Sequence, residues 1–379
     1  MQKLSLLLLL ALSCAALKPP HDGFVALCNG RDLTGWVIAN CAPETWSVRD
    51  GVIHCTGLPT GALRTTRQYE NFILELDWRH LTSGGNSGVF VWGTPIAAPG
   101  VPFLRGIETQ VLDHGYNEPG KDKYYTTHGD VFPIHGATMQ PFGRHNGQRS
   151  FPSGEFSKGF PEWNHYRIVG SNGVLRLSVN GHEVSGGAEC NYRKGYLALE
   201  SEGAPVEFRN LRLKELPSTG AVPEVTAPLD QGWHPLFTGL DLRGWKTNAA
   251  THARWTVGDE RLVLRAGTTE PETTLWSARE FGDAEFVVDC RVAKPGPELV
   301  APAPALQFRG TEFKLPTIPG QYQRFFITVK GRAVTVRLNE SEGEMQTLQL
   351  PPDAPRRSAL GLRPTGGAAE FMNLFAREL

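Results

Sequence analysis

The sequence has no excess of positive charge and no basic tract. Its 379 residues include 38 Lys and Arg against 39 Asp and Glu, which gives a formal net charge of -1, and the two signs are interspersed. Because binding to a phosphate backbone depends on a strong basic field, nucleic acid is not expected as a partner.

Long apolar runs are also missing, with one exception near the amino terminus. Lys3 is followed by an apolar run over residues 4–12 and then by Ser-Cys-Ala-Ala, which is the layout of a secretory signal peptide. The run is shorter than the ~20 residues that a membrane-spanning helix needs. The prediction is a signal peptide over residues 1–16 and an exported protein in the periplasm, at the cell surface or outside the cell.

Cys14 leaves two ways of processing this signal open. The preceding Ala-Leu-Ser resembles the box of bacterial lipoproteins, in which the cysteine is acylated and becomes the new amino terminus. The alternative is ordinary cleavage after Ala15 or Ala16. Membrane anchoring is therefore expected only through a lipidated Cys14.

No two cysteines have the C-x-x-C spacing that is typical of a structural zinc site. Five of the six cysteines follow the signal. In an oxidising compartment, four of these five could form two disulfides. Cys41 and Cys55 flank a predicted hairpin and are the first candidates for a pair.

Long stretches with helical period are absent, whereas glycine and proline are frequent, with 42 and 28 residues. Short alternating apolar runs between turn residues predict a mostly β chain. Asp50-Gly51 lies between two such runs and predicts a hairpin turn. In ENFILELDWRH, the alternation places Leu74 and Leu76 on the same face as Phe72 and Trp78.

A second set of motifs repeats the first after a linker. GLDLRGW at residues 239–245 matches GRDLTGW at residues 30–36, and the chain ends on AEFMNLFAREL where the first set has VEFRNLRLKEL. Residues 217–229 are rich in Pro, Ser, Thr and Ala, which is typical of a linker. The prediction is a duplication, with a first domain over residues 22–216 and a second, degenerate copy over residues 230–379.

One stretch of the first domain has no polar counterpart in the second copy. It runs from Asn86 to Asp113 and reads GNSGVFVWG, a proline-rich loop, and GIETQVLD. Strand alternation puts Glu108 and Gln110 on one face, roughly 6 to 7 Å apart. The second copy reads APALQFRG and TEFKLP there, so the scaffold persists while the polar set does not. A solvated strand face with ordinary polar residues is the alternative.

These residues together resemble the bacterial 3-keto-disaccharide hydrolase family. The resemblance rests on LxGW, the Trp-x-Val-x-x-Gly hairpin, GNSGVF, IExQxLD, EWN, LxVNG and EFRNLRLKEL, and it covers the first domain better than the second. It implies an all-β fold of two concanavalin A-like antiparallel jelly-roll β-sandwiches in tandem, with a carbohydrate on the concave face. The implied activity is cleavage of glycosides that carry a ketone at C3 of the sugar ring.

The family pattern also supplies candidate site residues. It implies substrate contacts by Asn86, Ser87, Gly88, Gln110 and Asp113. Trp92 is a further predicted contact, because an aromatic ring next to the GNSG strand could stack on a sugar ring. Glu108 is the predicted base for the acidified C2 proton, with His128 as the alternative, and Asn86 or Gln110 would stabilise the enolate oxygen. The family usually has a segment like GALY where this chain reads HGDVF from His128. Glu75 and Asp77 also share a strand face, but they lie outside the stretch in which the copies diverge.

The sequence itself requires no cofactor, but a divalent metal could bind. Residues 115–161 contain many Gly, Pro and His residues with little periodicity. Asp122, His128, Asp130 and His135 lie in this segment, although their spacing matches no metal motif.

Two further functional classes stay open at this point. The fold that the resemblance implies serves lectins as well as enzymes, so a non-catalytic carbohydrate-binding module is the first alternative. A structural domain of a cell-surface protein, in which the tandem sandwiches act as a spacer, is the second.

Overall fold

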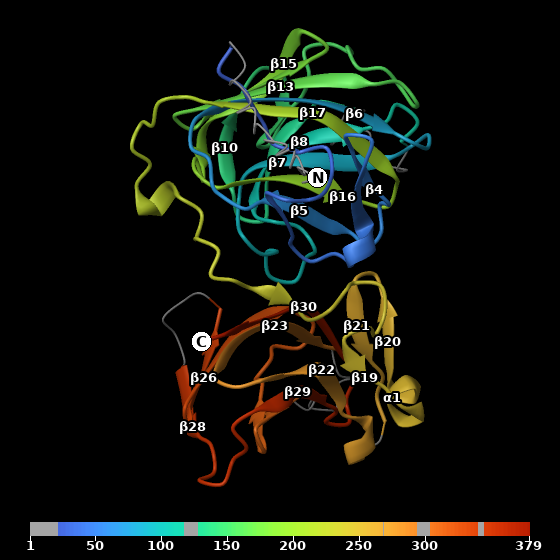
Figure 1. Cartoon of the computed structure of the whole chain (residues 1–379), viewed down its shortest axis with the longest axis vertical. Coiled ribbons are helices and arrows are strands. Elements are labelled where there is room, and N and C mark those ends of the chain that lie inside the picture. Colours follow the sequence, from blue (N-terminus) through green and yellow to red (C-terminus); the bar gives the residue numbers. More distant parts are fainter. Residues whose placement is uncertain (1–21, 117–127, 268, 294–303, 340–344) are drawn as a thin grey trace, which may run out of the picture.

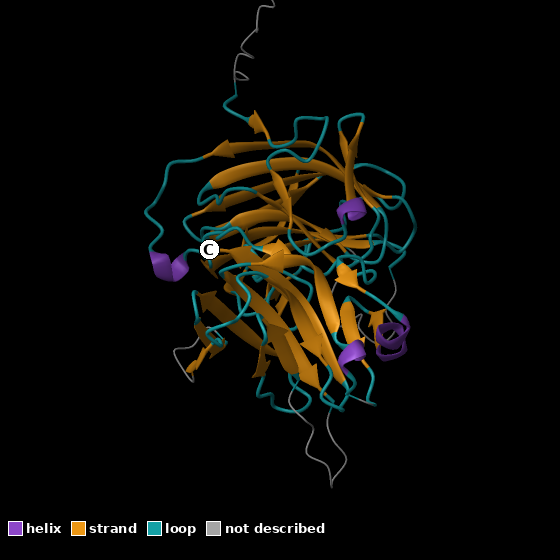
Figure 2. Cartoon of the chain, turned by 60° about the horizontal axis from the view of Figure 1, so that its bottom comes forward, coloured by secondary structure: helices purple, strands orange, loops and turns teal. Residues whose placement is uncertain are grey.

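The structure, a computed structural model, describes residues 22–116, 128–267, 269–293, 304–339 and 345–379. The predicted signal peptide and lipidation site, together with Asp122, lie outside these residues. Regular structure is almost all β, as predicted, and the helical turns are short (Figure 2). They are η1 (Pro43–Thr45), η2 (Pro223–Val225), α1 (Ala249–Arg254) and η3 (Pro271–Thr273).

The strands β1 to β17, which we call the first unit, form two antiparallel sheets in the upper half of Figure 1. The larger sheet contains, in spatial order, β10 (Thr138–Pro141), β15 (His182–Asn191), β14 (Val174–Val179), β13 (Asn164–Ser171), β6 (Phe72–His80), β17 (Val206–Glu215), β4 (Val52–Cys55) and β3 (Trp46–Arg49), with β1 (Val25–Ala26) against β17. The smaller sheet contains β11 (His145–Asn146), β12 (Arg149–Ser150), β9 (Val131–Ile134), β8 (Gly106–Leu112), β7 (Asn86–Gly93), β16 (Tyr196–Ser201), β5 (Gly61–Thr65) and β2 (Trp36–Ile38).

The strands β18 to β30, the second unit, also form two antiparallel sheets. The larger sheet contains β20 (Trp255–Gly258), β21 (Arg261–Leu264), β30 (Ala369–Glu378), β23 (Ala284–Val292), β26 (Gln323–Lys330), β27 (Ala333–Leu338) and β28 (Met345–Gln349), with β18 (His234–Pro235) against β30. The smaller sheet contains β19 (Trp245–Lys246), β22 (Leu275–Phe281), β29 (Ser358–Arg363), β24 (Ala305–Phe308) and β25 (Thr311–Lys314). When the larger sheet of the second unit is followed from β28 to β20, its strand order corresponds to that of the first unit from β15 to β3. The first unit has β10 as an additional edge strand. The duplication and the domain boundaries stay predictions.

Each unit buries its own apolar core between its two sheets. In the first unit, Leu74 of β6 faces Val89 and Ile107 of the smaller sheet within one cluster of buried side chains. The predicted alternation of β6 is confirmed, because Phe72, Leu74, Leu76 and Trp78 are all buried there. The predicted hairpin is confirmed as well: Asp50 and Gly51 join β3 to β4 with positive φ angles of 51° and 78°.

Two expectations about local structure are corrected. The segment over residues 115–161 was expected to have little regular structure, yet it supplies four short strands, β9 to β12. The five cysteines in the described part of the chain are free thiols, so Cys41 and Cys55 form no disulfide there. Both are buried in the apolar core, where they pack as small hydrophobic side chains.

A buried polar cluster of the second unit holds the proline-rich loop of the first. Asp289 and Arg324 form an ion pair with both side chains almost completely buried, and the Arg324 Nη2 donates to the Ala97 carbonyl at 2.8 Å. Asp289 also accepts a hydrogen bond from the Gly100 backbone N–H at 2.9 Å. Asn373 donates to two further loop carbonyls, at 3.0 and 2.8 Å. We call Asp289, Arg324 and Asn373 the loop clamp.

Gly100 is required for this contact. Its φ of +71° disfavours other residues, and a Cβ there would lie 2.5 Å from the Cβ of Tyr322. The loop therefore approaches the second unit as closely as its backbone allows. No helix among the described residues is long and apolar enough to cross a membrane.

The loop clamp predicts a large stability effect. Asp289→Ala leaves the buried Arg324 guanidinium without its carboxylate, and removing one partner of a buried pair costs about 3–5 kcal/mol. We expect a marked fall in the midpoint of thermal unfolding. Arg243→Ala is the matched control, because Arg243 pairs with Glu44 across the same two units but is exposed. Equal midpoints for the two variants would contradict the clamp.

Candidate functional site

The smaller sheet of the first unit has one apolar face and one polar face. Ser87, Val89 and Val91 of β7 face the core together with Ile107, Thr109 and Val111 of β8, as shown by their burial and their pairing. The register pairs Gly88 with Gln110 and Phe90 with Glu108, so these side chains lie on the opposite face. The predicted split of β8 is confirmed. The alternative of a solvated strand face is wrong, because Glu108 and Gln110 are only 6% and 5% exposed.

Gly88 sits between two carboxyl groups. A Cβ at this position would lie 2.7 Å from Oε1 of Glu108 and 2.8 Å from Oε2 of Glu200. Glu108 comes from β8 and Glu200 from β16, the two strands that flank β7. Any larger residue would push one or both carboxyl groups away, so Gly88 is what allows them to approach each other across the strand.

Both carboxyl groups are held toward their neutral form. Burial raises the pKa of Glu108 well above its ordinary value, and the nearby Glu202 raises it further. Burial also raises the pKa of Glu200, and Glu202 adds charge repulsion and a hydrogen bond between the two carboxyl groups. Such crowding of carboxyl groups in a dry site prevents all of them from ionising together.

Arg149 distinguishes Glu108 from Glu200. Its positive charge lowers the pKa of Glu108, in part offsetting burial and repulsion, whereas no cation acts on Glu200 to a comparable degree. The Arg149 guanidinium is fixed at the site, because it donates to Asp130 at 2.6 Å and to Oε1 of Gln110 at 2.7 Å. Arg149 therefore opposes the effect of burial at Glu108.

Gln110 and Asn86, the two amide side chains of the site, differ in which of their hydrogen-bonding atoms remain available to a ligand. Gln110 uses both ends of its amide, since Oε1 accepts from Arg149 and Nε2 donates to Oδ1 of Asn86 at 2.8 Å. That hydrogen bond fixes the orientation of the Asn86 amide. The Nδ2 of Asn86 donates to no other residue in the described ranges, so it is the amide donor available to a ligand.

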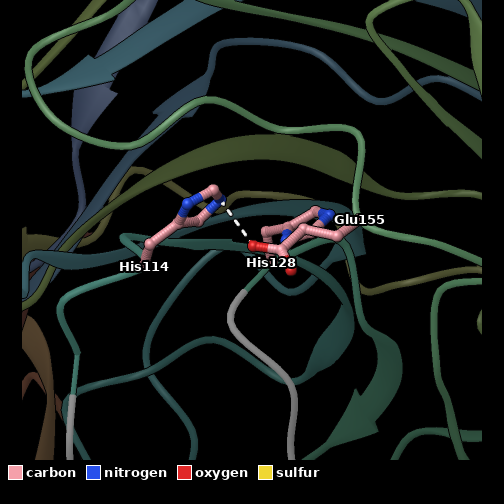
Figure 3. A group of neighbouring side chains, drawn as sticks. All are labelled: His114, His128 and Glu155. Carbon is pink, nitrogen blue, oxygen red and sulfur yellow. Dashed lines mark ion pairs between the residues drawn. The ribbon is translucent and has the colours of Figure 1, made fainter.

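A second cluster of titratable groups lies beside Asp113, where β8 ends. The atoms of His114, His128 and Glu155 that could ligate an ion all lie within 4.8 Å of one another. Figure 3 shows the ring of His114 facing the Glu155 carboxylate, at 3.3 Å from Nε2 to Oε1. Burial lowers the pKa of His128, and the positive charge of a protonated His114 lowers it further. Two imidazoles and a carboxylate are a donor set that suits zinc or another divalent transition metal.

The structure moves three predicted substrate contacts away from the polar face. Trp92 is completely buried in the core and donates from Nε1 to the Glu70 carbonyl at 2.9 Å, so it cannot stack on a sugar. Ser87 faces the core and donates to the Glu200 carbonyl at 2.8 Å. Asp113 is 3% exposed and anchors a loop, because it accepts three hydrogen bonds from backbone N–H groups.

The pKa of Asp113 reflects this structural role. Burial alone would raise it, but the hydrogen bonds from Gly84, Phe160 and Gly115 favour the ionised form and lower the pKa overall. Asp113 is thus a fixed anion that ties together the ends of two loops. We correct its predicted role from ligand contact to loop anchor.

The candidate metal ligands also separate. His128 belongs to the cluster with His114 and Glu155, whereas Asp130 pairs with Arg149. His135 is exposed and stacks on Phe103, with the ring centroids 5.6 Å apart. Among the described candidates, only His128 lies where three possible ligand groups meet.

Glu75 and Asp77 do not form a catalytic pair. Both lie on the outer face of the larger sheet, where Glu75 pairs with Arg167 and Arg212 and Asp77 pairs with His165 and Arg209. Their carboxylates are thus neutralised by cations, unlike those beside Gly88.

Glu200 and Glu202 were missed by sequence reasoning. The segment GYLALESEG does alternate, with Leu197, Leu199 and Ser201 facing the core and Ala198 and Glu200 facing the other side. The difference between the units was a further sign, because the second unit reads LGLRPTGG here and has no glutamate in this segment. Only the pairing of β16 with β7 brings Glu200 next to Gly88.

The second unit replaces the carboxyl pair with an ion pair. Its β24 lies between β25 and β29, as β7 lies between β8 and β16. Gln307 takes the position of Phe90 and is paired with Glu312 on one side and Gly361 on the other. Glu312 thus takes the register position of Glu108, and Arg363 takes that of Glu200. Glu312 and Arg363 lie 2.8 Å apart as an ion pair. TEFKLP therefore does supply a glutamate, but one that a guanidinium neutralises.

Fold and site define an antiparallel β-sandwich protein with a buried carboxyl cluster of the kind that serves general acid–base chemistry. The chain belongs to the family described as the 3-keto-alpha-glucoside-1,2-lyase-like domain, whose model matches residues 23–214. The match covers the first unit, in agreement with the resemblance found in the sequence. It supports a carbohydrate-active protein.

Three relatives illustrate this similarity. The chain is 23% identical over 232 residues to a 3-keto-disaccharide hydrolase of Bacteroides thetaiotaomicron, which covers 52% of this chain and 79% of that protein. A protein of Parabacteroides distasonis, provisionally described as a glycosyl hydrolase, has a TM-score of 0.41 and 23% identity over 52% of this chain and 95% of its own. A carbohydrate binding module from Bacillus subtilis has a TM-score of 0.31 and 14% identity over 48% and 96%.

The raised pKa of Glu200 predicts how stability depends on pH. Above the ordinary carboxyl value of 4.5, the unfolded chain loses this proton while the folded chain keeps it. The wild-type protein therefore loses stability as pH rises toward the raised pKa. Glu200→Gln has no proton to lose, so we expect it to be more stable than the wild type at neutral pH, with the difference shrinking toward about pH 4.

The measurement is the midpoint of thermal unfolding across this pH range. Glu183→Gln is the control, because Glu183 is an exposed glutamate that pairs with Arg176. If Glu200→Gln and Glu183→Gln changed the midpoint by the same amount at every pH, the strained carboxyl cluster would be ruled out.

Proposed function

We propose that the first unit cleaves glycosides that carry a ketone at C3, by removal of the C2 proton and elimination of the glycosidic oxygen. The observation that carries this proposal is the pair of buried carboxyl groups on either side of Gly88, one beside a cation and one without. In this proposal Glu108 acts as the base, and Glu200 with Glu202 acts as the acid. The family match and the relatives support the choice of substrate.

The ionised Glu108 is the proposed base. A ketone at C3 acidifies the C2 proton, and a base whose pKa is raised toward the working pH removes it most effectively. The electrons of the C2–H bond form an enolate whose oxygen is the former ketone oxygen. The Nδ2 of Asn86 donates a hydrogen bond to this oxygen. This role goes to Asn86 rather than to Gln110, because both ends of the Gln110 amide are already engaged.

The proton held between Glu200 and Glu202 completes the elimination. The enolate re-forms the C3 ketone, a double bond forms between C1 and C2, and the bond from C1 to the glycosidic oxygen breaks. The leaving oxygen takes the proton from the Glu200 and Glu202 pair. The enone that remains then adds water: the water oxygen bonds to C1, its proton returns to the glutamate pair, and Glu108 gives its proton back to C2. The net reaction is hydrolysis.

Export belongs to the same proposal. A sugar ligand suits a protein that carries the predicted signal peptide, and we propose a location in the periplasm, at the cell surface or outside the cell. The carbohydrate is the only partner proposed, with anchoring through a lipidated Cys14 as the one route to a membrane.

The test is release of the aglycone from a 3-keto-glycoside by the purified chain. Glu108→Gln should lower the rate by about 10²–10⁴-fold, the usual contribution of a general base. Glu312→Gln, which changes the glutamate at the same register position of the second unit, should leave the rate unchanged.

Two outcomes would contradict the proposal. Equal rates for Glu108→Gln and the wild type would remove Glu108 from the reaction. A wild-type protein that binds the sugar in calorimetry and releases no aglycone would instead be a carbohydrate-binding module, the alternative that the shared fold allows.

We further propose that His114, His128 and Glu155 bind a divalent metal ion near the end of β8. Two imidazoles and one carboxylate, with ligand atoms within 4.8 Å of one another, supply the three protein ligands that are typical of catalytic zinc sites. An ion bound there would supply a Lewis acid for a sugar oxygen. His128 would then be a ligand, which removes it as the alternative base.

Titration of the full chain with Zn²⁺ and Mn²⁺ in a calorimeter tests this site. His114→Ala should weaken binding at least about tenfold, since it removes one of three ligands. His135→Ala is the control, because His135 lies on the same segment as His128 but stacks on Phe103. Identical titrations of the two variants would exclude this donor set.

A further inference from the structure

A large groove lies between the two units, away from the carboxyl cluster. Its volume is about 530 Å³, within the range of sites that hold small ligands. The loop over residues 94–99 and Arg105 form the wall from the first unit, and β23, β26 and β27 form the wall from the second. The groove meets β7 and β8 at the ends marked by Gly93 and Gly106, whereas Gly88 and Glu108 lie further along these strands.

Aromatic rings from both units line this groove. Tyr192 comes from the first unit, Phe326 lies on β26, and Trp233 precedes β18. All three are half-buried, so part of each ring remains accessible. Flat apolar ring faces at the edge of a polar groove suit the C–H faces of pyranose rings.

A guanidinium lies over each ring. Arg105 is 4.1 Å from the centroid of Tyr192 and donates to the Tyr192 hydroxyl at 3.0 Å. Arg337 lies 5.1 Å from the centroid of Phe326. These contacts orient the guanidinium groups without neutralising their charge.

Among the described residues that line the groove, positive charges outnumber negative ones. Arg377 pairs with Glu285, the one carboxylate among the lining residues, and Arg324 pairs with Asp289 of the loop clamp. Arg105 and Arg337 form no ion pair with any residue in the described ranges. Two positive charges therefore face the groove in a chain whose formal net charge is -1.

Arg105 also carries an unsatisfied donor. Its Nε is buried and has no hydrogen-bond acceptor among the described residues. Leaving such a donor unpaired is costly, and an anion beside the guanidinium would recover part of that cost. Arg105 thus has no carboxylate partner among the described residues and one donor that the protein does not use.

We propose that this groove is a second binding site, for a saccharide that carries carboxylate groups, such as a chain of uronic acids. The carboxylates would pair with Arg105 and Arg337, and the sugar rings would pack on Tyr192, Trp233 and Phe326. That the ligand is a saccharide rests on the proposed function, whereas the preference for an anion rests on the two guanidinium groups. The site needs both units, because neither supplies both walls.

Calorimetric titration of the full chain with tetragalacturonate, against uncharged maltotetraose, tests this site. We expect tetragalacturonate to bind more tightly and its affinity to fall as salt is raised. Arg105→Gln and Arg337→Gln should each weaken it by about tenfold or more, because each loses one charge-assisted pair. Arg176→Gln, which changes an exposed arginine of the first unit that pairs with Glu183, should leave binding unchanged.

Several results would overturn the proposal. These are equal affinity for the charged and uncharged probes, no binding of either, or binding that is insensitive to Arg105→Gln and Arg337→Gln. Arg105→Lys keeps the charge and should retain more affinity than Arg105→Gln, which separates loss of charge from loss of packing against Tyr192. Loss of tetragalacturonate binding in Glu108→Gln would place the probe in the carboxyl site instead. Retained aglycone release by Arg105→Gln would show that failure of the groove leaves the proposed reaction intact.

Discussion

Everything at the candidate site depends on two carboxyl groups being buried against a residue that has no side chain. Burial of a carboxylate is costly, and a second carboxyl group nearby makes ionisation of both harder still. Gly88 lets Glu108 and Glu200 meet under these conditions, since it leaves empty the space that a Cβ would occupy. Arg149 then makes the pair unequal by favouring charge on Glu108 alone. The proposed division of the site into a base and an acid rests on the position of this one cation.

The sequence predicted the face of a strand better than the neighbours of that strand. Alternation along GIETQVLD correctly placed Glu108 and Gln110 together, because this property is local to the strand. Ser87 was predicted as a ligand contact from the family motif, yet its register places it on the core face of β7. Glu200 lies about 90 residues further along the chain and reaches Gly88 through the pairing of β16 with β7, which single-sequence patterns do not encode. Trp92 was predicted to contact the substrate, but its φ of 55° departs from strand geometry and its side chain lies in the core.

The two units show how little separates a strained site from a stable one. In the first unit, a glutamate from β8 and a glutamate from β16 lie on either side of β7, and burial raises the pKa of both. The second unit has Glu312 and Arg363 at the corresponding register positions, and the two side chains form an ion pair. The second unit therefore has an ion pair at the register positions where the first unit has two buried carboxyl groups.

The loop clamp contacts only main-chain atoms of the loop that it holds. Arg324 and Asn373 donate to carbonyl groups of the loop, and Asp289 accepts from a backbone N–H. These hydrogen bonds therefore involve no side chain of the loop. The anchorage is consequently indifferent to sequence at positions such as Ile96 and Pro99, which line the groove between the units. Mutations there can alter what the groove accepts while the loop keeps its course. The second unit thus holds this loop in place without using the side chains that line the groove.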